Sequence, residues 1–469
     1  MVGSSWDGEC YTRAFAAVRK HSPMEQPERQ QEERFPEDFL WGVSTSAYQV
    51  EEGDPDSQWV AWEKAGRIRS GHTRGRACEW WANAEQDFDL AKDLGLNSLR
   101  LSVDWSRIEP RPGVWQDDAV QRYRAMLKGL RDRGLRPFVT LHHFTHPAWF
   151  EERGGFLAPD SPGLFAQFAS RIVGELGDLC SDWVTINEPN VFCTLGYQLG
   201  DFPPGHKGQF RPAILALANM ARGHARAYRA IHRVQKEARV GWAQNYLVFA
   251  PANRRSFLDR MLCRLLDEIF NRSFFRIIAD GDAGITLRAF TGDVSEARGT
   301  ADFVGLNVYN RVHVAFDLRY REFLFANLFI PEHVPQGDQG TDWPYGEAYP
   351  EGITLAVKEA SPLGKPVYIL ENGVPDASDR LRPSFLIAAL RRVQQLTAQG
   401  FPVAGYFHWT LTDNFEWSEG WGLRFGLYAL DAELQQRRMR PSAEVYKAVV
   451  RSNSVPVELE AKYPWIAPP

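Results

Sequence analysis

Short apolar runs alternate with amphipathic helical patterns along almost the whole chain, and this alternation most constrains the fold. Eight runs have the length and composition of buried strands: Phe39–Val43, Ser98–Leu101, Pro137–Leu141, Trp183–Ile186, Val240–Ala243, Phe303–Leu306, Val367–Leu370 and Val403–Phe407. Between them, apolar residues recur at helical spacing in Asn83–Leu94, Asp117–Arg133, Leu164–Leu176, Pro212–Val234, Phe257–Ile278 and Ser384–Ala398. Such alternation predicts a parallel sheet, and eight strands are what an α/β fold of the (β/α)8 TIM barrel type requires.

The pattern extends from Phe35 to about Ser452, so we expect a single barrel domain over residues 35–452 with long loops after the strands. With 469 residues, 44% of them hydrophobic, the chain can bury a large core. Residues 1–34 show no continuous apolar stretch and are expected to form a flexible tail rather than a secretory signal. Residues 453–469 form a C-terminal extension. The segment Phe316–Pro335 lacks clean periodicity and is predicted to be a long loop over the barrel mouth.

Composition excludes several classes of function. There are 54 basic and 59 acidic residues, and a net charge of -5 disfavours nucleic acid as a partner. No run of 18 or more uncharged apolar residues exists, so no membrane span is expected. The five cysteines are odd in number and lack paired spacing, which favours a reduced, cytoplasmic location. Oligomeric state is left open.

Two glutamates directly follow strand-like runs. Glu188 comes before Pro189, and Glu371 comes before Asn372-Gly373. A charged residue at the carboxyl end of a barrel strand is typical of a catalytic group, because all these ends lie on one face. The alternative for either glutamate alone is a salt-bridged or solvated loop carboxylate.

Other strand ends carry amide, imidazole, hydroxyl and indole groups, which we expect at the same mouth: Gln49, Arg100, His143, Asn187, Asn307, Tyr309, Trp409, Glu416 and Trp417. Neutral polar groups beside flat aromatic faces suit a sugar, whose hydroxyls need fixed partners and whose C–H faces pack on rings. His142, His143 and His146 raise the alternative of a metal site. No acidic residue or cysteine accompanies them at ligand spacing, so no metal site is expected.

Five motifs stand in order along the chain: Phe39–Gly42 with Ser46–Gln49, Arg100–Ile108 with Pro110 and Gly113, Thr185–Asn190, Glu371–Gly373, and Asp413–Trp417 with Gly420 and Arg424–Leu427. Together they resemble glycoside hydrolase family 1, the β-glucosidase family, over nearly the whole chain.

The resemblance implies a retaining β-glycosidase that hydrolyses unphosphorylated β-glucosides, or also β-galactosides and β-fucosides, through a covalent glycosyl-enzyme. It implies Glu371 as the nucleophile and Glu188 as the acid and then the base, two carboxyl groups about 5–5.5 Å apart. Arg100 and Tyr309 are then expected beside Glu371, where they favour its ionised form, while the charge of Glu371 raises the pKa of Glu188. No cofactor is implied.

By the same resemblance, the remaining residues bind one small-molecule β-glycoside or the end of an oligosaccharide. Gln49 and Glu416 hold the outer hydroxyls, His143 and Asn187 the inner ones, and Trp409 and Trp417 form the walls, with Asn307 and Tyr309 in the same set. A carboxylate at the position of Glu416 would repel a 6-phosphate group.

Departures from the family pattern limit the resemblance. Phe144 stands where Trp is usual, Val308 where an aromatic residue is usual, and Leu370 where Thr often precedes the nucleophile. Because neighbours along a strand point to opposite faces, Leu370 should face away from the sugar if Glu371 faces it. Two alternatives stay open: a transglycosidase that uses the same site, favoured by an apolar loop that excludes water, and an inactive sugar-binding protein, which normally lacks one of the two glutamates.

Overall fold

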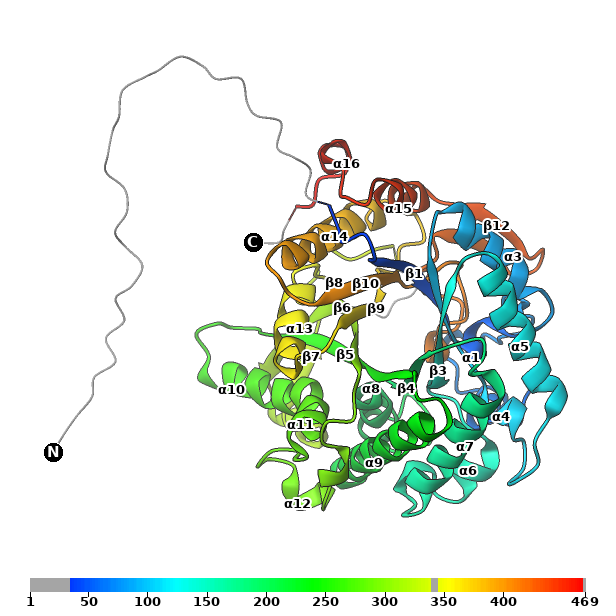
Figure 1. The fold of residues 1–469 in the computed structure, drawn as a ribbon. Coiled ribbons are helices and arrows are strands. Elements are labelled where there is room, and N and C mark those ends of the chain that lie inside the picture. The colour runs from blue at the N-terminus through cyan, green and yellow to red at the C-terminus, as the bar shows by residue number, and fades with distance from the viewer. Residues whose placement is uncertain (1–33, 339–344, 467–469) are drawn as a thin grey trace. The chain divides into compact units, whose positions relative to one another are not determined.

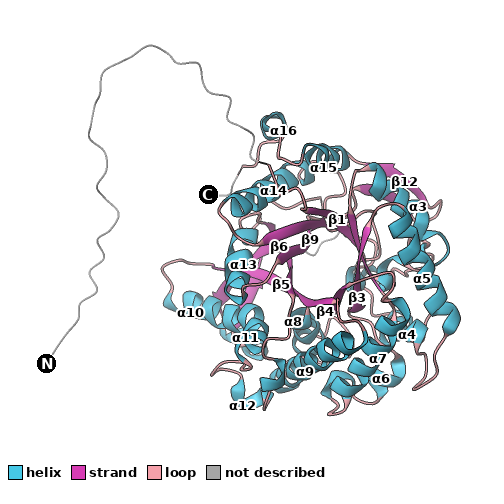
Figure 2. Ribbon diagram, viewed as in Figure 1, coloured by secondary structure: helices cyan, strands magenta, loops and turns pink. Residues whose placement is uncertain are grey.

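Eight parallel strands close into a barrel (Figure 2). The structure is a computed structural model that describes residues 34–338 and 345–466. The barrel strands are β1 (Leu40–Ser44), β2 (Ser98–Ser102), β3 (Arg136–His142), β4 (Asp182–Asn187), β5 (Arg239–Pro251), β6 (Phe303–Phe316), β9 (Val367–Asn372) and β10 (Val403–His408). Each pairs in parallel with the next, and β10 pairs with β1 to complete the ring. All eight strand predictions are confirmed.

The interior of the barrel is filled by side chains that nearly every strand contributes: Leu40, Phe138, Val184, Ala243, Phe303, Tyr368, Leu370 and Phe407. Phe138 meets Phe303, Tyr368 and Phe407 edge-on, with ring centroids 5.9, 5.3 and 5.2 Å apart. Edge-to-face aromatic contacts stabilise a core beyond their buried area. A packed interior leaves only the two ends of the barrel for a site.

Helices surround the barrel and alternate with its strands (Figure 1). The long ones are α3 (Trp80–Asp93), α5 (Asp117–Asp132), α7 (Ser161–Leu176), α9 (Phe210–Val234), α13 (Gly352–Ala360), α14 (Arg382–Ala398) and α15 (Pro441–Ser452). The last two strands are each followed by a helix, as a (β/α)8 barrel requires. Helices α13 and α15 had not been predicted from the sequence.

One predicted helix is interrupted. Where the pattern indicated a single helix over Phe257–Ile278, the chain forms α10 (Phe257–Leu266), a π-helical turn η4 (Asp267–Arg272) and α11 (Ser273–Asp280). In the π turn, the Asn271 side chain accepts a hydrogen bond from the Leu247 amide and donates one to its carbonyl, at 3.0 and 2.8 Å. This tertiary contact fastens the turn to β5, which periodicity alone does not reveal. Single π turns are frequent at functional sites.

The prediction of an irregular loop over Phe316–Pro335 was wrong, because this segment forms regular structure. Strands β5 and β6 stay paired beyond the barrel, and β7 (Ala326–Phe329) returns antiparallel to β6 after a short η6 turn (Leu318–Phe323). A further short strand, β8 (Glu347–Ala348), also pairs with β6. The irregular apolar residues are explained by packing, because Phe323 and Leu328 contact Leu262 and Leu266 of α10 in one cluster.

Shorter elements fill the connections: α1 (Ala47–Val50), α2 (Gln58–Lys64), η1 (Arg69–Gly71), α4 (Trp105–Ile108), α6 (Ala148–Glu152), η2 (Gly155–Leu157), α8 (Pro189–Cys193), η3 (Thr194–Leu199), α12 (Arg288–Thr291), η5 (Ser295–Ala297), η7 (Ser361–Leu363), η8 (Trp417–Glu419), β11 (Tyr428–Asp431), β12 (Gln436–Met439) and α16 (Val457–Lys462). Among the described residues, no helix combines the length and the apolar character needed to cross a membrane.

The described part of the C-terminal extension packs on the barrel. The Asn453 side chain accepts a hydrogen bond from the Trp41 indole at 3.0 Å and donates to the Phe35 carbonyl at 2.8 Å, and Glu460 pairs with Arg391 of α14. Except for Arg34, the predicted N-terminal tail lies outside the described residues, and its flexibility stays a prediction.

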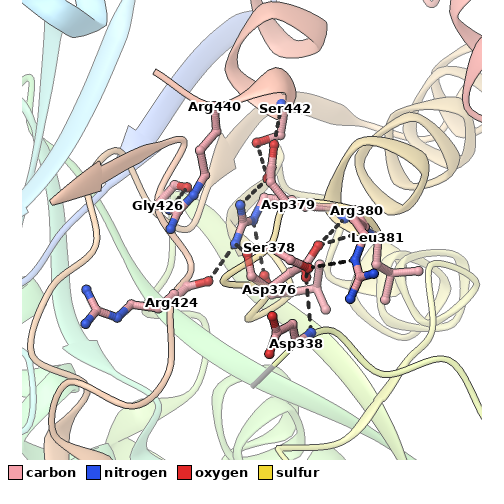
Figure 3. Close-up of polar contacts among 12 residues, drawn as sticks. Asp338, Asp376, Ser378, Asp379, Arg380, Leu381, Arg424, Gly426, Arg440 and Ser442 are labelled. Carbon is pink, nitrogen blue, oxygen red and sulfur yellow. Dashed lines mark hydrogen bonds and ion pairs between the residues drawn. The ribbon is translucent and has the colours of Figure 1, made fainter. Parts of the chain in front are cut away.

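A buried polar cluster ties the loop after β9 to the rest of the domain. Figure 3 shows Asp379 bonded to Ser442, at 2.8 Å to the amide and 2.7 Å to the hydroxyl. The same carboxylate forms an ion pair with Arg382, which is fully buried and also donates to the Arg424 carbonyl at 2.6 Å. Because Arg382 begins α14 and Arg424 lies beside the strand ends, the cluster holds the loop that follows Glu371.

We expect the substitution Asp379→Asn to lower the free energy of unfolding by about 3–5 kcal/mol, because it leaves the Arg382 guanidinium buried without its counter-charge. Asp89→Asn is the matched control, since Asp89 pairs with Arg133 on the surface with 60% of its side chain exposed, and it should change stability by less than about 1 kcal/mol. Denaturant unfolding followed by tryptophan fluorescence measures both. Equal effects of the two variants would contradict the structural role of Asp379.

Candidate active site

The carboxyl ends of the strands bring most of the predicted residues to one mouth. Arg100 comes from β2, Asn187 and Glu188 from the end of β4, Asn307 and Tyr309 from β6, and Glu371 from β9. A cavity of about 560 Å³ opens there, within the size range of small-molecule sites. Seven predicted residues line it: His143, Glu188, Tyr309, Glu371, Trp409, Glu416 and Trp417.

Glu371 lines this cavity and is held by a cation and a hydroxyl group. Its carboxylate forms a buried ion pair with Arg100 and accepts a hydrogen bond of 2.6 Å from the Tyr309 hydroxyl. Only 3% of the residue is exposed. Burial raises the pKa of Glu371, and the Arg100 charge followed by the Tyr309 hydrogen bond oppose this rise. The predicted positions of Arg100 and Tyr309 beside Glu371 agree with the geometry.

Glu188 occupies a turn between β4 and α8, with φ of 44° in the left-handed region. Its carboxyl group accepts hydrogen bonds from two neutral amides, Asn307 at 2.8 Å and Asn245 at 3.0 Å. Burial, and secondly the charge of Glu371, raise the pKa of Glu188 from its ordinary value of 4.5 to about 8. The expected direction of the shift is therefore found, with burial rather than Glu371 as its main cause.

A β-bulge turns Glu371 into the cavity. Along β9, Tyr368 and Leu370 point into the barrel interior, while Ile369 packs on the helix side. Strict alternation would send Glu371 outward, but the register between β6 and β9 shifts between Leu306 and Asn307. Bulges beside active sites re-aim side chains in this way. Leu370 was expected on the opposite face from Glu371, but the register shift places both on the inner side of β9, with Leu370 in the packed interior and outside the lining of the cavity.

Polar residues behind the lining link the two carboxyl groups. Asn187 accepts hydrogen bonds from Arg100 at 2.6 Å and from Asn307 at 3.1 Å, and its own amide meets His143 Nε2 at 3.1 Å. Burial and the nearby Arg100 charge lower the pKa of His143 well below its usual range, so the ring is neutral. Arg100, Asn187 and Asn307 are fully buried and do not line the cavity themselves. Direct sugar contacts of Asn187 and Asn307 therefore stay predictions.

The loop after β10 supplies another part of the site. The Gln49 amide donates to Glu416 at 2.9 Å and to Asn414 at 3.2 Å, and Ser46 donates to Gln49 at 2.7 Å. Burial raises the pKa of Glu416 to about 8, and the charges of Glu371 and Glu188 add to that rise. Gln49 is fully buried and reaches the cavity only through Glu416.

Aromatic rings form the walls. Trp417 stacks on Tyr48 with ring centroids 5.6 Å apart, and His143 lies between Trp417 and Trp409 at 5.9 and 6.0 Å. Phe144, which stands where the family usually has Trp, packs edge-on against Trp417 at 5.1 Å and also lines the cavity. The exchange therefore keeps an aromatic wall but removes an indole donor.

The histidines considered as metal ligands are engaged elsewhere. His142 meets His146 at 3.3 Å, and His146 Nε2 bonds to Glu151 at 2.7 Å, in a buried layer behind the site. Within residues 34–338 and 345–466, no group of three or more possible ligands is arranged for a metal ion.

Sequence reasoning missed two residues of the site. Asn245 contacts Glu188, and it lies opposite Asn307 in the parallel register of β5 and β6. The apolar run ends at Ala243, so the fifth strand had been ended too early. The other is Tyr345, which lines the cavity and packs on Phe425 at 5.2 Å. Residues 339–344, just before it, lie outside the described residues.

Comparison with known proteins agrees with this site. The sequence matches the family described as "Glycosyl hydrolase family 1" over residues 31–455. The chain belongs to glycosyl hydrolase family 1. A family 1 β-glucosidase from Thermotoga maritima superimposes with a TM-score of 0.84 at 29% identity, covering 91% of this chain and all of that one. A β-glycosidase from Pyrococcus horikoshii gives 0.82 at 33% identity, covering 93% and 99%.

A curated relative within glycosyl hydrolase family 1, a β-galactosidase from Sulfolobus acidocaldarius, is 31% identical, with coverage of 91% of this chain and 97% of that protein. β-Glucosidase A of Thermotoga maritima is 30% identical over 90% and 99% of the two chains. A β-glucosidase from Thermotoga maritima solved in complex with glucoimidazole gives a TM-score of 0.83 at 30% identity, covering 90% of this chain and 100% of that one.

Replacing Glu188 by glutamine tests the electrostatics of the site through stability alone. The folded chain binds this proton more tightly than the unfolded chain, so the stability it contributes is present below pH 4.5 and is lost as the pH rises through about 8. We expect Glu188→Gln to match the parent at pH 4.5 and to be more stable at pH 8.5, by an amount on the order of a few kcal/mol. Thermal unfolding across this pH range measures the difference.

The exposed Glu433 provides the control, because Glu433→Gln should follow the parent at every pH. Glu416 also has a raised pKa, so part of the decline with pH remains in the Glu188 variant. If parent and Glu188→Gln differed equally at pH 4.5 and 8.5, the raised pKa would be refuted.

Proposed function

We propose that this chain is a retaining β-glycosidase that hydrolyses unphosphorylated β-glucosides, with Glu371 as nucleophile and Glu188 as acid and base. The observation that carries the proposal is that two carboxyl groups in one cavity have different hydrogen-bond and charge partners. Glu371 is held by Arg100 and a hydroxyl group, and Glu188 by neutral amides. This difference favours an anion at Glu371 and an acid at Glu188.

One amide lies near both acids. The Asn307 amide donates to Glu188 at 2.8 Å, and Asn307 also lowers the pKa of Glu371. The separation of the two carboxyl groups decides between the two mechanisms. Retaining enzymes hold them about 5–5.5 Å apart, whereas inverting enzymes need about 6.5–9.5 Å to admit a water molecule.

The reaction follows from these charges. The Glu371 carboxylate attacks the anomeric carbon, the glycosidic bond breaks, and the leaving oxygen takes the proton of Glu188. Once Glu371 is an ester its charge is gone, so the pKa of Glu188 falls. Glu188 then accepts a proton from water, which attacks the anomeric carbon and releases Glu371.

Buried polar groups at and behind the lining also support a sugar ligand. His143 Nδ1, Asn307 Oδ1 and Asn414 Nδ2 are buried and have no hydrogen-bond partner within the described part of the chain. An unpaired buried polar group costs about 1–3 kcal/mol, and a polyhydroxyl ligand offers partners. The aromatic rings of Trp409 and Trp417 present flat faces to its C–H groups.

Two further observations bear on which sugar is bound. Relatives with similar coverage are named β-glucosidase and β-galactosidase, so both sugars are candidates. Glu416, which is held by Gln49, lines the cavity. With a pKa near 8, Glu416 is neutral or negative around pH 7. Either form lacks the positive charge that a 6-phosphate group needs.

Leaving-group dependence separates the two roles. Glu371→Gln should abolish turnover of every β-glucoside, because no covalent intermediate can form. Glu188→Gln should lower kcat/KM, which reports the first step, by about 10²–10⁴-fold for alkyl β-glucosides and much less for nitrophenyl β-glucosides, because nitrophenolate leaves without a proton. Values of kcat/KM on both substrate types decide this, with Glu433→Gln as the control. Ordinary rates for Glu371→Gln would exclude it as the nucleophile.

Transfer to an alcohol instead of water remains a second candidate, supported by the apolar side chains that line part of the cavity. Proton NMR of fresh product from a β-glucoside, with and without methanol, reads stereochemistry and transfer together. We expect β-glucose, and methyl β-glucoside when methanol is present. An initial α-product would mean inversion, and a large methyl glucoside fraction at low methanol would favour the transglycosidase.

A further inference from the structure

Beyond the sugar-binding residues, the cavity continues into an apolar groove. We call this part the outer groove and define it by Leu195, Leu247, Phe249, Phe270, Leu328 and Ile330, all of which line the cavity. They come from the π-helical turns η3 and η4, the extension of β5, and the β6–β7 hairpin with the residue after it. Segments far apart in the sequence thus present one kind of surface.

The outer groove begins at the leaving-group side of Glu188. Asn245, which donates to the Glu188 carboxyl at 3.0 Å, is followed on β5 by Leu247 and Phe249. Residues two apart on a strand share a face, and all three line the cavity. In the proposed reaction Glu188 protonates the leaving oxygen. The group attached to that oxygen therefore lies over Leu247 and Phe249.

The walls of the outer groove are fixed by packing. The Phe249 and Phe270 rings meet edge-on, with centroids 5.9 Å apart. Phe249 and Leu328 both pack on the buried face of α10, and Asn271 fastens the π turn to β5 through two hydrogen bonds. A preformed apolar groove binds an apolar ligand without first losing the freedom of its own side chains.

Polar groups also occur in this part of the cavity. Arg69 forms ion pairs with Asp201 at 3.1 Å and with Glu419 at 2.6 Å. Thr194 and Gln198 of η3 line the cavity as well, and Gln198 Nε2 is buried without a hydrogen-bond partner among the described residues. A second sugar would need hydroxyl partners on several sides, whereas β5, η4 and the hairpin contribute mainly apolar side chains to the outer groove. The apolar wall has no hydroxyl or amide side chain among its six defining residues.

We propose that the outer groove binds a long apolar aglycone, so that the preferred substrates are amphiphilic β-glycosides rather than oligosaccharides. This inference rests on the proposed function and names the leaving group of that same site. The hairpin extends the apolar surface, because Phe329 also lines the cavity and is 38% exposed. A chain longer than the groove would then lie over this ring instead of entering water directly.

A series of alkyl β-glucosides tests the inference. Methyl, butyl and octyl β-D-glucoside are assayed as monomers, below the concentration at which octyl glucoside forms micelles, together with cellobiose. We expect kcat/KM to rise about two- to fourfold per methylene group until the groove is filled, since burying one CH₂ contributes about 0.8 kcal/mol and 1.4 kcal/mol is a factor of ten. Cellobiose should fall below octyl glucoside. Equal values for all four substrates, or the highest value for cellobiose, would overturn the inference.

A pair of matched variants locates the effect. Ile330→Gln places an amide in the outer groove, whereas Ile285→Gln makes the same change at a residue that is 94% exposed. We expect the octyl-to-methyl ratio of kcat/KM to fall at least fivefold in Ile330→Gln and to stay at the parent value in Ile285→Gln. If Ile330→Gln does not fold, as judged by its thermal unfolding, Leu247→Gln replaces it on another wall.

The outcomes separate this inference from the proposed function. If no β-glucoside of the series is hydrolysed by the parent, the proposed function itself fails. If methyl β-glucoside is hydrolysed but chain length has no effect, the β-glycosidase stands and the apolar aglycone is refuted. An unchanged ratio in both Ile330→Gln and Leu247→Gln would likewise refute the outer groove as the binding place.

Discussion

The structure of the site depends on one ion pair inside the barrel, between Arg100 and Glu371. Arg100 is fully buried, and its guanidinium also donates to Thr140 at 2.9 Å and to Asn187 at 2.6 Å. A buried ion pair is weak evidence for stability, because removing two charges from water costs about as much as their attraction returns. Here the ion pair distinguishes two otherwise similar buried glutamates, Glu371 and Glu188, because only Glu371 contacts the Arg100 guanidinium directly.

The buried carboxyl groups at the mouth of the barrel are electrostatically unfavourable for folding. Glu188, Glu371 and Glu416 are all buried at one cavity, and each has a raised pKa. Functional sites commonly retain such strain, and the rest of the domain offsets it. Below the site, aromatic rings around Phe138 fill the barrel, and beside it the Asp379–Arg382 cluster holds the following loop in place. The packing of the surrounding domain therefore stabilises the site, whose own buried charges do not.

The elements predicted correctly are those whose signal is local. Eight apolar runs mark the strands, because a parallel strand is buried on both faces and shows as a continuous apolar segment. The elements predicted wrongly depend on partners far away in the sequence. The hairpin after β6 forms because β5 and β6 stay paired beyond the barrel, and Asn245 joins the site for the same reason. The π turn at Asp267–Arg272 depends on a contact between Asn271 and Leu247.

By itself, the sequence determined the barrel, the family whose motifs the chain carries, and the set of polar residues at the strand ends. Each of these follows from residue type and spacing along the chain. Tertiary structure decided what these residues touch. The register shift between β6 and β9 turns Glu371 inward, and the neutral amides of Asn245 and Asn307 rather than a cation meet Glu188. The outer groove, too, exists only after folding, because β5, the hairpin and two π turns each contribute part of its wall. A pKa and a cavity are properties of distances between chain segments, and distances in space are set by packing.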